Sequence, residues 1–151
     1  MISLLAADLE ENIVSPNPIP ANAKGTLIIA PLSLLTNWTN QISQHLHADS
    51  LTSVIYHGAN RSIDFTSYDV VVTSYGTLGS EYKVAGFSDK DGITNSQYNG
   101  LFTHTWKRVV LDEAHAIKNP RINVSLAVTR LESVMRWSLT GTLSLLNMRL
   151  M

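Results

Sequence analysis

The chain has 151 residues, of which 44% are hydrophobic and 15% charged, which is enough apolar material for one globular core. Its formal net charge of −1 excludes the global positive field of strongly basic nucleic-acid-binding proteins and leaves room only for a local basic patch. The absence of cysteine excludes disulfides and thiolate metal sites. No apolar run approaches the roughly 20 residues of a membrane span, so the sequence predicts no membrane partner.

The first third of the chain contains a helical pattern, a proline-rich stretch, a strand and a second helix. Residues 1–12 have the apolar spacing of a short amphipathic helix, and three alternate prolines in 15–20 favour an extended loop. The continuous apolar run 26–30 is typical of a strand that is buried on both faces. Apolar residues then recur at helical spacing over 34–46, and Ser33 is the expected N-cap of that helix.

The remainder of the chain alternates between strand and helix patterns. Four further runs of apolar and β-branched residues predict strands: 51–56, 68–75, 106–111 and 135–139. Residues 79–100 are rich in Gly, Ser, Asp and Asn, and they predict a polar surface insertion with little regular structure. Residues 123–132 have helical spacing. Strands that alternate with helices predict an α/β fold with a mainly parallel sheet and right-handed crossovers.

Polar residues gather where the predicted strands end, and ligands of parallel sheets bind at the carboxyl ends of strands. Four strands are followed by such residues: Ser33, Thr73-Ser74-Tyr75, Asp112-Glu113 and Thr140-Gly141-Thr142. Asp112 is placed to meet Mg²⁺ through water, because this hard ion keeps part of its hydration shell. Glu113 is placed to polarise the water that attacks a γ-phosphate. His115 would sense that phosphate or link the acidic turn to the Thr140–Thr142 loop.

Several of these features have a simpler interpretation. A metal-hydrolase site at Asp112, Glu113 and His115 is disfavoured because no second histidine lies at helical ligand spacing. Trp38 offers a surface for base stacking, but on an apolar helix face it is more often a core residue. The basic group from Lys118 to Arg121 fits a solvated helix entry as well as a DNA contact.

The residues Asp112-Glu113-Ala114-His115 resemble motif II, the DEAH box, of superfamily 2 helicases. Three further segments resemble motifs Ia, Ib and III of the Swi/Snf family of DNA translocases, in the same order: 27–38, 70–75 and 136–142. The Asn37-Trp38 pair and the polar stretch before Trp106 most resemble the branch that holds helicase-like transcription factor and the yeast post-replication repair and nucleotide-excision repair translocases.

The resemblance implies the first RecA-like lobe of an ATP-dependent translocase, a three-layer P-loop NTPase sandwich. It implies ATP and Mg²⁺ as cofactors of the intact parent, duplex DNA or chromatin as partner, and a nuclear role in DNA repair or chromatin remodelling. It also implies contacts with DNA phosphates, which position the protein without reading sequence. The candidates for those contacts are Ser33, Asn37, Thr73, Ser74 and Lys118.

The sequence departs from the family pattern in two ways. It contains no G-x-x-x-x-G-K-[ST] phosphate cradle, so we expect residues 1–142 to form a partial lobe that is incomplete at the P-loop strand and lacks the second lobe. Residues 143–151 do not match the family and are expected to be a tail. We therefore expect a fragment of an ATP-dependent translocase that is inactive alone. The alternative is that the chain acts only by binding, as a catalytically inactive fragment that binds DNA or a protein partner. The oligomeric state is left open.

Overall fold

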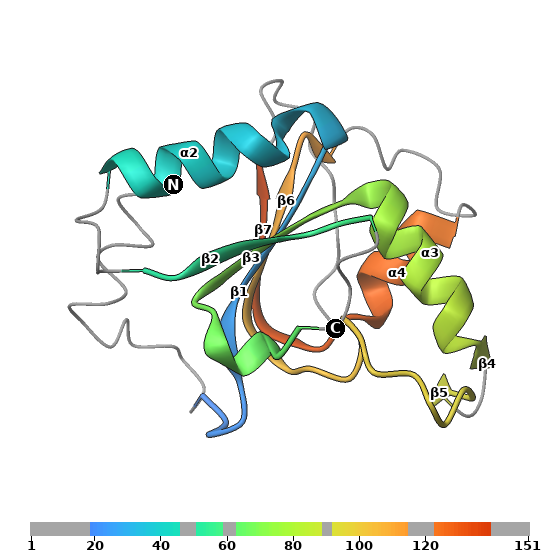
Figure 1. Ribbon diagram of the computed structural model, residues 1–151. Helices are drawn as coiled ribbons and strands as arrows, with labels where there is room; N and C mark the ends of the chain where they lie inside the picture. The colour runs from blue at the N-terminus through green and yellow to red at the C-terminus, as the bar shows by residue number, and fades with distance from the viewer. Residues whose placement is uncertain (1–18, 46–50, 59–62, 89–91, 115–122, 140–151) are drawn as a thin grey trace.

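The computed structural model describes residues 19–45, 51–58, 63–88, 92–114 and 123–139. A parallel sheet of five strands forms the centre of this part of the chain (Figure 1). Its strands are β1 (Lys24–Ala30), β2 (Ser53–Tyr56), β3 (Val70–Ser74), β6 (Trp106–Asp112) and β7 (Ser133–Leu139). They lie side by side in the order β2-β3-β1-β6-β7. The predicted α/β fold with its parallel sheet is therefore confirmed.

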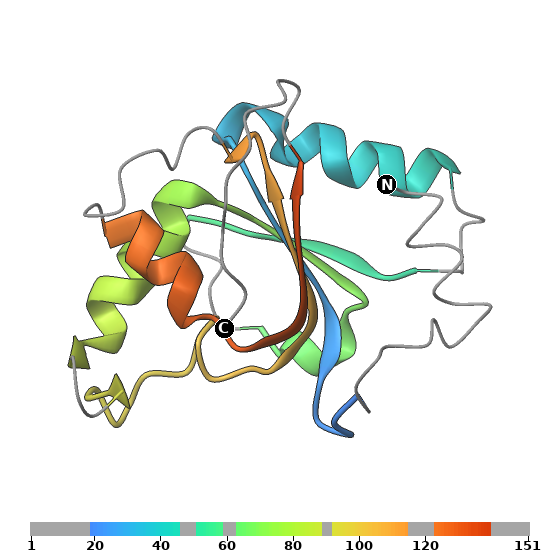
Figure 2. The same cartoon turned by 180° about the vertical axis from the view of Figure 1, so that it is seen from behind.

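Helices cover both faces of the sheet, which gives three layers (Figures 1 and 2). The short 3₁₀ turn η1 (Leu32–Leu34) leads into α2 (Leu35–His45), which packs on one face. The opposite face is covered by α3 (Tyr75–Ala85) and α4 (Asn123–Arg130). The turn η2 (Phe65–Ser67) precedes β3, and a small hairpin of β4 (Phe87–Ser88) and β5 (Gly92–Ile93) follows α3. None of the described helices is long and apolar enough to cross a membrane.

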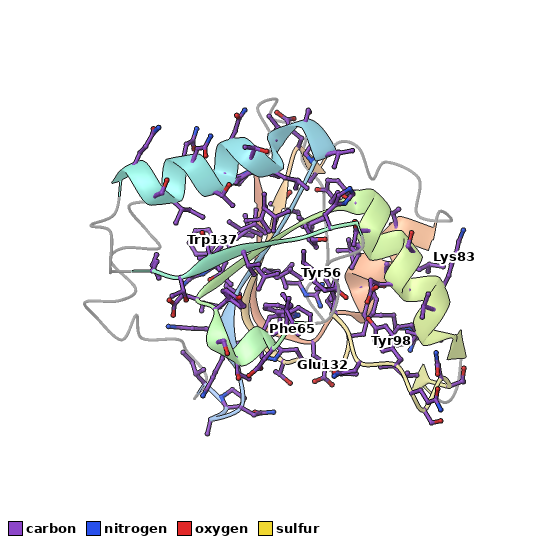
Figure 3. The ribbon with its side chains drawn as sticks, in the orientation of Figure 1. Tyr56, Phe65, Lys83, Tyr98, Glu132 and Trp137 are labelled. Atoms are coloured by element: carbon purple, nitrogen blue, oxygen red, sulfur yellow. The ribbon has the colours of Figure 1, made fainter. Side chains whose placement is uncertain are left out.

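The central strands are buried on both faces because successive side chains enter opposite cores. In β1, Leu27 and Ile29 join the core under α3 and α4, while Ile28 and Ala30 join the core under α2. The first core also holds an aromatic group, in which Tyr56 and Phe65 lie side by side with ring centroids 5.3 Å apart (Figure 3). The unbroken apolar runs of the sequence thus correspond to strands with helices on either side.

The expectation of little regular structure over residues 79–100 is wrong for its first part. Residues up to Ala85 continue α3, because the Ser74 side chain caps the start of that helix and Gly86 ends it with a left-handed φ of 64°. Gly79 is buried, and a Cβ at that position would lie 3.2 Å from Val124 Cγ2. The small residue allows α3 and α4 to pack closely, whereas the sequence pattern indicated a loop.

Smaller differences concern helix ends. Ser33 lies inside η1 and is exposed, so it is not the N-cap that the sequence indicated; the 3₁₀ turn is inserted between Pro31 and α2. Helix α4 ends at Arg130, two residues before the expected end. The predicted helix at 1–12 and the tail at 143–151 lie outside the described residues. The domain limits at 1–142 therefore stay predictions.

Candidate functional site

The carboxyl ends of the strands bring distant polar residues to one edge of the sheet. The strand register aligns Ala30 of β1 with Ser74 of β3, and Ile29 of β1 with Leu111 of β6. Turn η1, the start of α3 and the acidic turn after β6 therefore begin at the same edge. Five predicted site residues lie outside the described part of the chain: His115, Lys118, Thr140, Gly141 and Thr142.

Asp112 is held from both helical layers. Its Oδ2 atom accepts a hydrogen bond of 2.8 Å from Trp38 Nε1 of α2. Its backbone oxygen accepts a hydrogen bond of 2.7 Å from the Tyr75 hydroxyl at the start of α3. Hydrogen bonds to an ionised carboxylate are shorter and stronger than neutral ones. The side chain and the backbone of Asp112 are thus fixed by different elements, which orients the carboxylate before any ligand arrives.

The Tyr75 phenol remains a hydrogen-bond donor over a wide pH range. Burial raises the pKa of Tyr75 well above its usual value, and the negative charges of Asp112 and Glu113 raise this pKa further. The hydroxyl therefore keeps its proton, and with it the hydrogen bond to the Asp112 backbone, at neutral and moderately alkaline pH.

Glu113 has an unusual backbone conformation. Its φ is 50°, which makes it the one non-glycine residue with a positive φ in the described part of the chain. This left-handed region costs an L-residue about 1–2 kcal/mol because Cβ crowds the following carbonyl. Backbone strain of this kind clusters at functional sites. The turn after β6 therefore holds the Glu113 backbone in this conformation at some cost in stability.

Because of this cost, we expect glycine to be more stabilising than alanine at position 113, the reverse of the usual order. We expect Glu113→Gly to unfold at a higher urea concentration than Glu113→Ala, by about 1 kcal/mol in the free energy of unfolding. Both variants remove the same side-chain contacts, so their difference reports the backbone alone. Elsewhere glycine is the less stable of the two residues. A Glu113→Ala variant at least as stable as Glu113→Gly would show that the strain is absent in solution.

Thr73 and Ser74 do not present their hydroxyls to solvent. Thr73 has no exposed surface and donates a hydrogen bond of 2.8 Å to the Tyr56 carbonyl. Ser74 is 4% exposed, and its Oγ accepts from the Thr77 backbone N–H at 3.1 Å. Both hydroxyls therefore make hydrogen bonds within the fold, and contacts of Thr73 and Ser74 with DNA phosphates stay predictions. Ser33 and Asn37 are exposed, so they are the described candidates for outward contacts.

A polar cluster supports this part of the edge. His57 Nδ1 lies 2.7 Å from Thr77 Oγ1 and 3.4 Å from Ser74 Oγ, and the two hydroxyl oxygens are 3.0 Å apart. His57 follows β2 and lies outside helices and strands. These contacts join the end of β2 to the first turn of α3, because His57 follows β2 and Thr77 lies in that turn.

Trp38 and Tyr75 are the two site residues whose role the sequence reasoning missed. Trp38 is 9% exposed and packs in the core under α2, which confirms its core placement and disfavours base stacking. A buried indole N–H nevertheless needs an acceptor, so a buried Trp38 predicts a polar partner close to the core. Nothing in the local pattern indicated that the acceptor would be Asp112, 74 positions along the chain.

The acidic turn fits a magnesium ion that is shared with phosphates. Mg²⁺ is usually bound by one or two carboxylates together with waters and substrate phosphates. The described residues contain no group of three or more His, Cys, Asp and Glu side chains that could cage a metal. Among the described residues, the hydrogen bond to the Asp112 side chain comes from Trp38 and is accepted by Oδ2. Asp112 therefore suits a partial ligand set and not an all-protein site.

Similar proteins are found at the level of sequence. The family model described as SNF2-related domain matches residues 1–143. The chain is 39% identical over 121 residues to DNA repair protein RAD5A of Arabidopsis thaliana. It is 40% identical over 121 residues to helicase-like transcription factor of Homo sapiens. Each alignment covers 78% of this chain and 11% of the relative, so the chain spans about a tenth of the length of these proteins.

Solved structures agree with the sequence matches. The Sulfolobus solfataricus SWI2/SNF2 ATPase core in complex with dsDNA has a TM-score of 0.68 at 29% identity. The core domain from the same organism has a TM-score of 0.62 at 30% identity. Each match covers 93% of this chain and 24% of the solved chain. The resemblance drawn from the four motifs is confirmed: the chain belongs to the SNF2-related domain family, and its five-stranded parallel sheet has the fold of the SWI2/SNF2 ATPase core.

Proposed function

We propose that this chain is part of the first lobe of a nuclear, ATP-dependent DNA translocase of the DNA repair or chromatin remodelling type. The observation that carries the proposal is the Asp112-Glu113 turn, which lies at the carboxyl end of β6 and is held there by Trp38 and Tyr75. The DNA-bound core from Sulfolobus solfataricus supports duplex DNA as the partner.

The acidic turn would supply one half of a nucleotide site. In the complete site Asp112 would hold Mg²⁺ through water, and Glu113 would orient the attacking water. Mg²⁺ held by Asp112 would supply positive charge for phosphoryl transfer at this turn. His115, Thr140, Gly141 and Thr142 are proposed to complete this side of the site. The 151 residues contain no G-x-x-x-x-G-K-[ST] cradle, so we propose that the chain alone binds ATP poorly and does not hydrolyse it.

The DNA-facing surface is proposed to lie at the start of α2. Ser33 and Asn37 are both exposed, and both follow the carboxyl end of β1. Their hydroxyl and amide groups suit phosphate oxygens, which would give binding without sequence preference. Lys118 is proposed to add a charged contact. With a net charge of −1, the chain would depend on such local contacts and not on an overall positive field.

The purified chain is expected to bind short duplex DNA equally well for unrelated sequences. Its Kd should rise by roughly tenfold when the salt concentration is raised about fourfold, because phosphate contacts release counterions. Asn37→Ala should weaken binding by roughly 3-fold for every sequence, as expected for one lost hydrogen bond. Fluorescence anisotropy with labelled duplexes measures each of these quantities.

Asn40→Ala is the matched control, because Asn40 is an exposed asparagine of the same helix, almost one turn further from the sheet edge. Equal effects of the two substitutions would place the DNA elsewhere. A Kd that does not change with salt would contradict phosphate binding. Steady DNA-stimulated phosphate release by the purified chain would contradict the proposed lack of hydrolysis and leave the DNA contact in place.

A further inference from the structure

The hydrogen bond from Trp38 to Asp112 joins the helix that follows β1 to the end of β6. The donor is Nε1 of a side chain that is 9% exposed, and the acceptor is a carboxylate oxygen 2.8 Å away. Trp38 belongs to the same buried core cluster under α2 as Ile28, Val72 and Val110. Close-packed interiors transmit displacements because they leave little free volume. The indole therefore moves with α2, and Asp112 Oδ2 follows the indole.

The outward neighbour of Trp38 is Asn37. The two residues are consecutive in the first turn of α2, yet Asn37 is exposed and Trp38 is buried against the acidic turn. One turn of helix thus faces solvent on one side and holds Asp112 on the other. A ligand that pulls or rotates this turn changes the position of the Trp38 donor relative to the carboxylate.

A second hydrogen bond holds the backbone of Asp112. The Tyr75 hydroxyl donates to the Asp112 backbone oxygen at 2.7 Å, from the helix on the other face of the sheet. The backbone of Asp112 is therefore anchored from α3, while its side chain is held from α2. With the backbone anchored, motion of α2 is converted into rotation of the carboxylate and not into displacement of the whole turn.

We propose that Trp38 is a positioning residue that couples DNA binding at the start of α2 to the orientation of the Asp112 carboxylate. The coupling rests on the proposed function, because it takes DNA as the ligand of the α2 surface. By linkage it is reciprocal: a change at Asp112 alters DNA affinity through Trp38. The hydrogen bond from Trp38 Nε1 to Asp112 Oδ2 is the contact through which we propose that the effect passes in both directions.

The chain's three tryptophans allow a direct test by NMR of the ¹⁵N-labelled full chain. Each indole N–H gives one cross-peak, and Trp38→Phe identifies the peak of interest. Adding a short blunt duplex should shift the Trp38 peak. Trp106 is the internal reference, because its buried Nε1 donates at 3.1 Å to the Leu101 carbonyl and it lies at the opposite end of β6. Its peak should stay in place.

The outcomes separate the two proposals. Anisotropy measured on the same sample reports whether DNA binds. Binding with an unmoved Trp38 peak overturns the coupling and leaves the proposed function intact. If no DNA binds, both proposals fall. Equal shifts of the Trp38 and Trp106 peaks would indicate a general change of the fold, and they also overturn the specific coupling.

A double-mutant cycle tests the reciprocal effect. Asp112→Asn weakens the acceptor, so it should weaken DNA binding by roughly 5-fold in the otherwise unchanged chain. In the Trp38→Phe background the same substitution should have no effect, because the connection has already been removed. Trp106→Phe is the matched background: it also loses a buried indole, and it should keep the full Asp112→Asn effect. An undiminished effect in Trp38→Phe overturns the proposal, and circular dichroism confirms that each variant is folded.

Discussion

Replacing Trp106 by alanine is expected to lower the free energy of unfolding by about 3–5 kcal/mol. Trp106 has no exposed surface, and its indole donates to the Leu101 carbonyl. Its ring packs edge-on against Phe65 and His104, at centroid distances of 5.4 and 4.5 Å. Domains are stable by only about 5–15 kcal/mol, so the loss would be a large part of the total. Urea unfolding followed by circular dichroism measures the change.

Trp137→Ala is the control for this prediction. Trp137 lies on the edge strand β7 and is 36% exposed, with the Arg108 guanidinium 5.8 Å from the centre of its ring (Figure 3). Its truncation removes less buried surface than truncation of Trp106, so it should cost clearly less. Equal losses for the two variants would mean that Trp106 is not more deeply buried than Trp137 in solution.

Tyr98→Phe is expected to cost about 1–3 kcal/mol, because it leaves a buried acceptor without this donor. The Tyr98 hydroxyl donates to Glu81 Oε2 at 2.8 Å, and Glu81 is 4% exposed on α3. Gly100 leaves room for this contact, since a Cβ there would overlap the Glu81 carboxylate and the Tyr98 hydroxyl. The neighbouring exposed Gln97, changed to alanine, should alter stability by less than about 0.5 kcal/mol. Equal effects of the two substitutions would contradict the buried contact.

The same phenol gives the prediction a pH dependence. Burial raises the pKa of Tyr98 above its usual value, and the hydrogen bond and charge of Glu81 raise this pKa further. A raised folded-state pKa favours the protonated form, so its contribution is complete below the unfolded pKa of about 10 and is lost as pH rises above it. The stability difference between the original chain and Tyr98→Phe should therefore shrink above about pH 10. A difference that is constant with pH would show that the phenol is not buried.

Local sequence patterns determined the sheet. The apolar run at 26–30 and the β-branched run around Val70–Val72 have the composition of doubly buried strands, and both became central strands. The placement of Asp112 at the end of a strand followed from the same pattern, because two carboxylates cannot continue an apolar run. Parallel strands then bring their carboxyl ends to one edge, so the sequence was sufficient to locate the candidate site.

The segment from 79 onwards shows where composition misleads. Its glycines and polar residues are typical of loops, but Gly79 is required by close packing of α3 on α4 and Gly86 by a left-handed helix end. Glu81 is polar and buried because Tyr98 supplies a hydrogen bond. Each of these reasons involves a partner or a backbone angle that the local pattern does not contain.

The sequence by itself determined the fold class, the order of the motifs and the edge of the sheet at which Asp112 and Glu113 lie. Only the tertiary structure decided which polar groups point outward and which are held inside. It turned Thr73 and Ser74 inward, and it joined Trp38 to Asp112. The physical reason is the same in each case: a buried donor must find an acceptor, and the acceptor that lies within reach is set by the packing of the whole domain.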